Sequence, residues 1–204
     1  MTRDRRRNQH NIKSKRVVLV SYEGNNKTER NYFDSFKGID KNYTIKVVPG
    51  NETDPVILVK QTIEKSKELK LDLNNDDRAY CIFDTDINTR KNIQIKQALD
   101  LARDNNITLI TSSPCIEVWF LLHYEYTTAN MNSDTVIKRL KCYYPKYTKN
   151  CNMHPIIIDK VNIACNNAKK LEKYHIDNSR VIESVEANPH SDVYKIIEEL
   201  NSIK

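Results

Sequence analysis

The sequence predicts an α/β protein with a mostly parallel four-stranded sheet flanked by helices and with a helical C-terminal extension. Two observations lead to this fold class. Four short apolar runs alternate with helix-like stretches over the first 125 residues of the 204-residue chain, and such alternation is typical of βαβ units in a parallel sheet. After Tyr126 the pattern is helical and irregular, so we expect the remaining third to be mainly α-helical.

Four runs carry the strand signal. They are short, apolar and rich in β-branched or aromatic residues, which is typical of parallel strands buried on both faces. Residues that favour turns end three of them: Gly24 after the first, Pro49-Gly50 after the second and Asp84 after the third. The expected strands cover residues 17–22, 43–48, 79–83 and 106–111.

Capping residues and helical spacing locate the helices. Thr28 can cap the first helix, and Asp54 followed by Pro55 gives the second a cap and a proline at its first position. Ser113-Pro114 and Asn188-Pro189 predict the start of two later helices in the same way. The expected helices cover about residues 28–36, 55–69, 91–104, 114–123, 134–141, 159–174 and 190–202.

The net charge of the chain lies at one end. Residues 1–16 hold seven of the 33 basic residues and one of the 27 acidic residues, so the whole net charge of +6 belongs to this segment. We expect residues 1–16 to be a basic, disordered N-terminal arm, which either contacts nucleic-acid phosphates or only keeps the protein soluble. We expect a catalytic core at residues 17–125 and a mainly helical part at residues 126–204 packed on it.

Composition also predicts the compartment. No run approaches the roughly 18 apolar residues of a membrane span, and no apolar segment follows the first basic residues, as a secretory signal requires. The five cysteines include no Cys-x-x-Cys, which favours free thiols and a cytoplasmic protein with no membrane partner. Cys142, Cys151 and His154 could form part of a zinc site, but their spacing is irregular and a fourth ligand is not obvious.

Five carboxylates follow the predicted strands. Glu23 comes directly after the first strand, Asp84 and Asp86 after the third, and Glu29 and Glu117 lie in the helices after the first and fourth. Ligands of open α/β sheets bind beyond the carboxyl ends of the strands, so we expect the five to converge. Two carboxylates about 4 Å apart repel by about 4 kcal/mol at an effective dielectric of about 20. A cation would relieve this repulsion, and oxygen ligands without histidine favour Mg²⁺ or Mn²⁺.

Each acid also has a structural interpretation. Glu29 can stabilise a helix N-terminus, Asp84 and Asp86 can form turns, and Glu117 can pair with a buried arginine. Glu23 can be an ordinary loop residue. The joint position of all five favours a divalent-metal site over these separate interpretations.

Four sequence blocks resemble those of the RloB-like family, whose catalytic core is of the Toprim type. Residues 17–33, with Glu23-Gly24, Thr28-Glu29 and Tyr32-Phe33, are similar to the family's opening block. The other similar blocks are Phe83-Asp-Thr-Asp86, which resembles the D-x-D of that core, residues 112–123 and residues 188–200. The blocks occur in family order, and the departures at Ser113 and Ile116 replace no acid.

The resemblance implies a Toprim fold that binds Mg²⁺ through a glutamate after the first strand and through the D-x-D. It also implies a metal-dependent nuclease that hydrolyses phosphodiester bonds and acts as an effector in antiphage defence. A short chain with no reading module suggests recognition by shape or of single strands, so we expect the substrate to be tRNA-like RNA or DNA. A sensor protein from the same defence locus is the expected regulatory partner. The alternative is a non-catalytic or partner-regulated Toprim protein that binds nucleic acid.

In such a nuclease we assign Asp84 and Asp86 as metal ligands and Glu23 as a ligand or general acid/base. Glu29 and Glu117 would complete a second metal position, and Glu117 is also counted among the catalytic residues. Three basic residues flank the acids and either contact the scissile phosphate or are ordinary surface charges: Lys27, Arg90 and Lys91.

Other polar and aromatic residues have two interpretations. His123 is either a proton shuttle or the donor of a structural hydrogen bond, which its angular distance from Glu117 on a helix favours. Trp119 and Phe120 are better explained as core than as base-stacking platforms. The run Tyr143–Tyr147, with lysines beside it, either stacks on single-stranded nucleic acid or packs as a loop.

Overall fold

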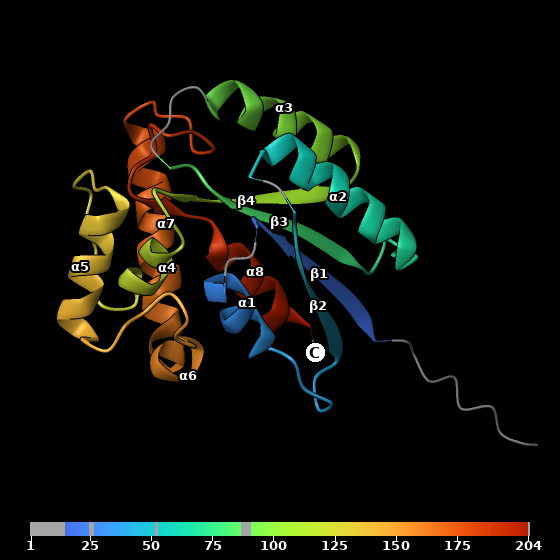
Figure 1. Ribbon diagram of the computed structural model, residues 1–204, viewed down its shortest axis with the longest axis horizontal. Coiled ribbons are helices and arrows are strands. Elements are labelled where there is room, and N and C mark those ends of the chain that lie inside the picture. Colours follow the sequence, from blue (N-terminus) through green and yellow to red (C-terminus); the bar gives the residue numbers. More distant parts are fainter. Residues whose placement is uncertain (1–14, 25–26, 52, 87–90, 204) are drawn as a thin grey trace, which may run out of the picture.

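A mostly parallel sheet forms the middle layer of the computed structural model, which describes residues 15–24, 27–51, 53–86 and 91–203 (Figure 1). The strand order is β2-β1-β3-β4-β5, with β1 to β4 parallel and β5 antiparallel to β4. The strands are β1 (Arg16–Tyr22), β2 (Tyr43–Pro49), β3 (Arg78–Asp84), β4 (Ile107–Ser113) and β5 (His190–Ser191).

The α/β class and the four strands expected from the sequence are confirmed. The fifth strand was not expected, because a strand of two residues produces no alternating or apolar pattern. β1 begins at Arg16, one residue before the predicted start, and the Arg16 guanidinium lies 2.9 Å from the Glu199 carboxylate. Residues 1–14 of the expected basic arm lie outside the described residues.

The helices follow the predicted order. The Asp54 carboxylate accepts hydrogen bonds from the backbone N–H groups of Val56 and Ile57, as expected of a cap. The helices are α1 (Lys27–Asp34), α2 (Pro55–Glu68), α3 (Lys91–Asp104), α4 (Glu117–Leu122), α5 (Ser133–Tyr143), α6 (His154–Ile157), the 3₁₀ turn η1 (Ile158–Lys160), α7 (Val161–Asp177) and α8 (Val193–Ser202).

Two proline signals for helix starts were wrong. The Ser113-Pro114 peptide is cis, Ser113 is the last residue of β4, and α4 begins three residues after the proline. The Asn188-Pro189 peptide is also cis and leads into β5 rather than into a helix. The Asn188 side chain hydrogen-bonds both the N–H and the carbonyl of Met131, so it fastens a loop instead of capping a helix.

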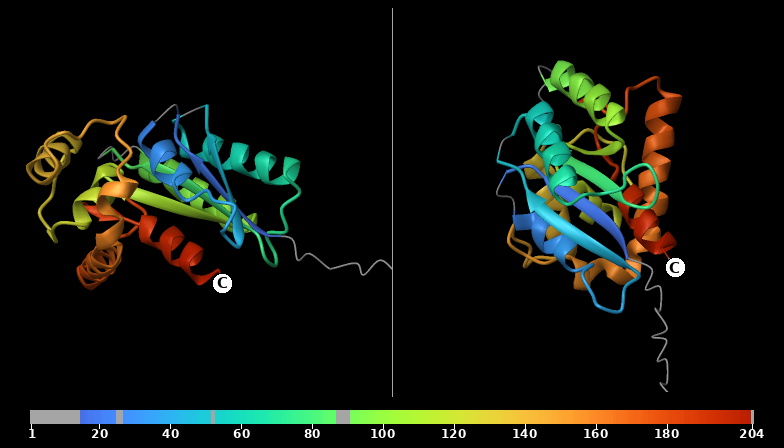
Figure 2. Two further views of the ribbon diagram at one scale, coloured as in Figure 1. Left: turned by 90° about the horizontal axis from the view of Figure 1, so that it is seen from below. Right: turned by 90° about the vertical axis from the view of Figure 1, so that its right-hand side faces the viewer.

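Each face of the sheet has its own hydrophobic core. α2 and α3 cover one face, whereas α1 and α8 lie on the other, with the remaining helices gathered beside them (Figures 1 and 2). Side chains alternate along the strands as expected. Leu19 and Cys81 belong to the core under α2 and α3, while Val20 and Ile82 belong to the opposite core.

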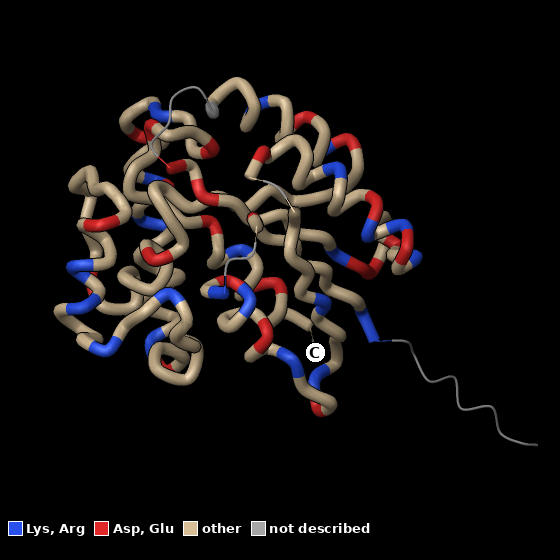
Figure 3. The backbone as a smooth tube through the Cα atoms, viewed as in Figure 1, with Lys and Arg blue, Asp and Glu red and all other residues tan. Residues whose placement is uncertain are grey.

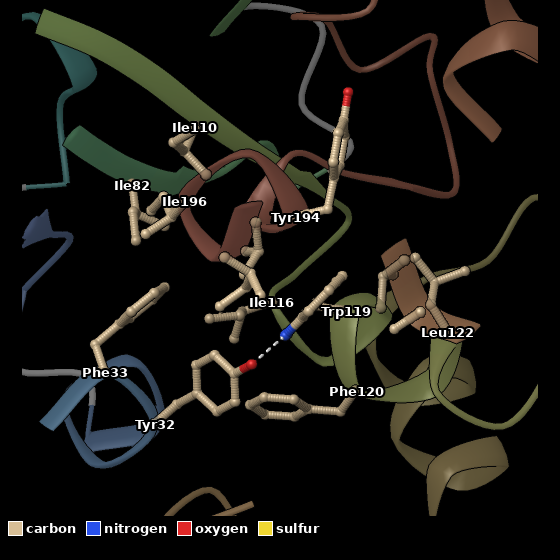
Figure 4. Close-up of a cluster of buried hydrophobic side chains, with 14 of the residues drawn as sticks. Tyr32, Phe33, Ile82, Ile110, Ile116, Trp119, Phe120, Leu122, Tyr194 and Ile196 are labelled. Carbon is tan, nitrogen blue, oxygen red and sulfur yellow. Dashed lines mark hydrogen bonds between the residues drawn. The ribbon is translucent and has the colours of Figure 1, made fainter. Parts of the chain in front are cut away.

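The second core joins the sheet to the C-terminal helices. Trp119 of α4 is completely buried in it, and the Trp119 indole N–H donates to the Tyr32 hydroxyl at 2.8 Å (Figure 4). Phe120, Leu171 and Ile196 are buried in the same cluster. The interpretation of Trp119 and Phe120 as core residues is therefore confirmed, and the helices after residue 126 share a core with the sheet.

No helix within the described ranges is long and apolar enough to span a membrane. All five cysteines have free thiols.

Candidate metal centre

The ends of β1 and β3 bring the first two predicted acids together. In the sheet Tyr22 of β1 is paired with Ile82 of β3, so Glu23 and Asp84 leave the same edge. The Asp84 backbone N–H donates a hydrogen bond to Glu23 Oε2 at 3.4 Å. Gly24 turns the chain away immediately afterwards with φ of +59°, a conformation that glycine adopts without the penalty of a Cβ atom.

The N-terminal turns of α1 and α4 supply two more acids. Glu29 and Glu117 lie in these first turns and are 3% and 2% exposed. Acidic segments lie near the centre of the molecule as well as along the outer helices (Figure 3). Burial of two carboxylates near the same strand ends is costly unless a donor or a cation compensates them.

Asp84 lies within electrostatic reach of the other four acids. Burial raises the pKa of Asp84 well above its usual value, and the charges of Glu29, Glu117, Glu23 and Asp86 raise it further. Asp84 Oδ1 is buried and has no hydrogen-bond partner within the described parts of the chain. The carboxyl group at the end of β3 is therefore the group on which the charges of the other four acids act.

Asp86 lies in a turn after β3 and not in the strand itself. Residues two positions apart in a regular strand point to the same side, but β3 ends at Asp84 and Asp86 has φ of +51°. The Thr85 N–H bonds to the Ser112 carbonyl at 2.9 Å, which starts the turn. Asp86 is exposed, and its effect on the pKa of Asp84 is the smallest of the four.

The acids are not arranged as a complete set of metal ligands within the described residues. No three His, Cys, Asp or Glu side chains in the described ranges 15–24, 27–51, 53–86 and 91–203 lie close enough to hold a metal ion. This finding also gives no support to a zinc site at Cys142, Cys151 and His154. The chemistry of the acid cluster nevertheless fits a hard divalent cation, because all donors are carboxylate oxygens and the buried Asp84 oxygen needs a partner.

The predicted phosphate-binding residues remain predictions. Lys27 is exposed at the first position of α1, two residues before Glu29. Arg90 lies outside the described residues, and Lys91 begins α3 with a side chain that is likewise outside them.

Two further residues contact the acids and were not assigned to the site from the sequence. The Tyr147 hydroxyl donates a hydrogen bond to Glu117 Oε1 at 2.7 Å. Burial, followed by the charges of Glu117 and Asp84, raises the pKa of the Cys115 thiol. Cys115 could have been found because it lies two residues before Glu117, whereas Tyr147 is thirty residues away and gave no local signal.

His123 makes the structural hydrogen bond favoured by its position on the helix. Its ring is 1% exposed, and its Nδ1 lies 2.9 Å from the Trp119 carbonyl oxygen. Because that oxygen can only accept, Nδ1 carries the proton of the neutral ring. The hydrogen bond that the structural interpretation of His123 requires is therefore present.

We expect His123 to make the folded protein sensitive to mild acid. Burial lowers the pKa of His123 to about 4, whereas an unfolded histidine takes up its proton near pH 6.5. Between these values the unfolded chain binds more protons, so the free energy of unfolding falls as the pH falls. Relative to His123→Asn, which keeps an N–H donor but does not titrate, the wild type should lose about 2 kcal/mol between pH 7 and pH 5. Urea unfolding at both pH values measures this difference, and identical pH slopes would contradict the prediction.

The fold and the site together define a class of protein. It is an α/β protein with a mostly parallel sheet that carries Asp84 at its carboxyl edge, within reach of four other acidic charges. This is the edge at which such sheets bind their ligands.

The chain belongs to the RloB-like protein family, because the model of that family matches residues 18–200. The resemblance stated from the four sequence blocks is thereby confirmed. No match was found among curated proteins or among solved structures.

Proposed function

We propose that this protein is a metal-dependent nuclease that hydrolyses phosphodiester bonds of tRNA-like RNA or of DNA and acts in the cytoplasm as an effector of antiphage defence. The observation that carries the proposal is that four acidic charges act on the partly buried Asp84 carboxyl group, whose Oδ1 is buried without a hydrogen-bond partner among the described residues. Like charges held together in this way destabilise the fold, and sites with such conflicts are commonly functional.

The residues of the centre have distinct proposed roles. Asp84, Asp86 and Glu23 would hold one Mg²⁺ or Mn²⁺ ion, and Glu29 and Glu117 would complete a second position. When bound, the metal supplies activation of water and stabilisation of the leaving oxygen. Glu23 serves as a ligand or as general acid/base, and its Oε2 already accepts the Asp84 N–H bond that fixes it at the strand end.

Several basic residues would position the nucleic acid. Lys27 at the start of α1 is exposed and lies near two of the acids in sequence. Arg90 and Lys91 would help to neutralise the phosphate. Only a substrate panel can separate RNA from DNA, since the 2′-hydroxyl that distinguishes them is recognised by local contacts.

The proposal is tested by incubating the full chain with total RNA, purified tRNA or supercoiled plasmid in Mg²⁺, Mn²⁺ or EDTA. The wild type should cut at least one substrate with either metal and none in EDTA. The Asp84→Asn/Asp86→Asn variant should cut none of them. Cleavage that survives in this variant or in EDTA would contradict the proposal and place the chemistry elsewhere.

A partner-regulated nucleic-acid-binding protein is the second candidate. It is favoured by one observation: no three potential ligands among the described residues meet in a ligating arrangement. Binding of the same nucleic acids without cleavage under any metal condition would support it. A sensor protein from the same locus would then be the natural partner to restore activity, and its addition is the deciding experiment.

A further inference from the structure

Glu117 is held by a tyrosine from a distant part of the chain. Tyr147 is 1% exposed, and its hydroxyl donates to Glu117 Oε1 at 2.7 Å, both residues being buried. The ring of Tyr147 packs against Phe120 with 6.4 Å between the ring centroids. The hydroxyl is thus delivered to the carboxylate by a side chain whose ring is fixed in the core.

The backbone that carries Tyr147 is fastened to α1. We refer to residues 144–150 as the docking segment. The Thr28 hydroxyl donates to the Lys149 carbonyl at 2.8 Å, and the Asn31 side-chain amide donates to the Asn150 carbonyl at 2.9 Å. A single segment therefore bonds both to α1, which carries Glu29, and to α4, which carries Glu117.

The chemical type of this contact suits a metal ligand. A tyrosine hydroxyl donates one hydrogen bond to a carboxylate without adding the positive charge that an arginine or lysine would bring into the centre. A donor fixed on one carboxylate oxygen sets the orientation of the other. Ligating carboxylates are commonly hydrogen-bonded by such outer residues, and loss of these residues weakens metal binding.

We propose that Tyr147 is a positioning residue of the metal centre, whose hydroxyl orients the Glu117 carboxylate toward the cation. This inference rests on the proposed function, because it needs the acid cluster to bind a metal. Tyr147 acts through Glu117 and not on the substrate. The tyrosines of the run Tyr143–Tyr147 therefore differ in environment. Tyr147 contacts the acid cluster, whereas Tyr143 is 44% exposed and stacks on Tyr124.

The test compares two tyrosine-to-phenylalanine variants of the full chain by Mn²⁺ titration with electron paramagnetic resonance, which needs no turnover. Tyr147→Phe should weaken Mn²⁺ binding about 10- to 100-fold. Tyr32→Phe is the matched control, since Tyr32 is equally buried and its hydroxyl bonds to the Trp119 indole rather than to an acid. It should leave Mn²⁺ affinity within about twofold of the wild type, although it removes a buried hydrogen bond of similar cost.

Two further sets of variants test the same inference. If Tyr147 acts through Glu117, adding Tyr147→Phe to Glu117→Gln should weaken binding no further, a non-additivity expected of residues in contact. Thr28→Val, which removes the bond to the docking segment, should weaken Mn²⁺ binding in the same direction, while Thr28→Ser should retain wild-type affinity. This pair tests the inference even if the Tyr147 variant folds poorly.

The outcomes separate the two proposals. A wild type that binds no Mn²⁺ overturns the metal centre and the inference with it. A wild type that binds Mn²⁺ while the folded Tyr147→Phe variant binds equally well overturns the inference alone. Equal weakening by Tyr147→Phe and Tyr32→Phe would also overturn it, because the effect would then be a general loss of packing.

Discussion

The Asp84→Asn variant is expected to lose metal-dependent cleavage by at least about 10³-fold and at the same time to become more resistant to heat in metal-free buffer. The loss follows because a metal ion contributes several kcal/mol of charge stabilisation to hydrolysis, and each 1.4 kcal/mol is about tenfold in rate. The gain follows because an amide of the same shape removes one of the mutually repelling charges.

The sign of the stability change follows from the pKa of Asp84. That pKa is raised well above the usual value by burial and by the neighbouring acids, so folding takes up a proton at this group. The free energy of unfolding therefore decreases as the pH rises from about 4 through the folded pKa. Asp84→Asn removes this decrease, and its melting temperature in EDTA at pH 7 should exceed that of the wild type.

Asp100→Asn is the matched control for both effects. Asp100 is exposed on α3, where its carboxylate lies 2.6 Å from the Arg103 guanidinium, on a helix over the opposite face of the sheet. Its replacement should change neither cleavage nor melting temperature appreciably. An Asp84→Asn variant that cleaves normally, or that melts below the wild type in EDTA, would contradict the prediction.

The second large effect is expected at Asp192, which is completely buried after β5. Its Oδ2 accepts from the Thr111 hydroxyl at 3.0 Å, and its Oδ1 lies 2.6 Å from Lys195 Nζ and 3.2 Å from His190 Nε2. Asp192→Ala would leave the Thr111 hydroxyl without its acceptor and would remove the buried carboxylate beside Lys195 and His190. A hydrogen bond to a buried charged group contributes about 1.5–3 kcal/mol, and removing one partner of a buried ion pair costs about 3–5 kcal/mol, so the variant should lose about 3 kcal/mol or more of unfolding free energy.

Urea denaturation at pH 7 measures this loss, and Glu68→Ala provides the contrast. Glu68 lies 2.6 Å from Lys65 on the surface of α2, and an exposed pair of this kind contributes less than about 1 kcal/mol. A loss at Asp192 no larger than at Glu68 would show that the buried cluster contributes little.

The contribution of Asp192 should also depend on pH. Burial alone would raise the pKa of Asp192, but the hydrogen bond and charge of His190 and the charge of Lys195 hold it well below its usual value. The stabilisation is therefore fully present above the unfolded pKa near 4 and is lost as the pH falls toward the lower folded value. The difference between wild type and Asp192→Ala should shrink below pH 4.

The local pattern of the sequence was sufficient for most of the fold. Apolar runs of five or six residues and the Asp54-Pro55 cap are local signals, and the structure has strands and a helix where they predicted them. The two wrong helix starts were predicted from Ser-Pro and Asn-Pro pairs. These pairs are common both at helix starts and in tight connections, so the local sequence does not distinguish the two. At Asn188 tertiary contacts decided the outcome, because the side chain bonds the backbone of Met131, 57 residues away along the chain.

Only the part of the candidate site that depends on the order and direction of the strands could be predicted from the sequence. Parallel strands place their carboxyl ends at one edge, so the approach of Glu23 to Asp84 followed from the strand positions. The turn at Asp86 did not, because it is bonded to a distant part of the chain: the Thr85 and Asp86 N–H groups donate to the carbonyls of Ser112, near the end of β4, and of Pro114, just after it. Tyr147 was beyond prediction for another reason: its contact with Glu117 depends on how a connection between two C-terminal helices folds back over α1 and α4.

The position of the docking segment and of α7 and α8 late in the chain bears on how the protein is made. All five acids emerge from the ribosome before Tyr147 and before the two helices that close the core around α4. Before these parts are made, a nascent polypeptide carries every proposed ligand. It still lacks the Tyr147 hydroxyl that bonds to Glu117 and the helices α7 and α8 that complete the core around α4. Arrangement of the acids around Asp84 is thus coupled to synthesis of the C-terminal helices, which complete the core around α4.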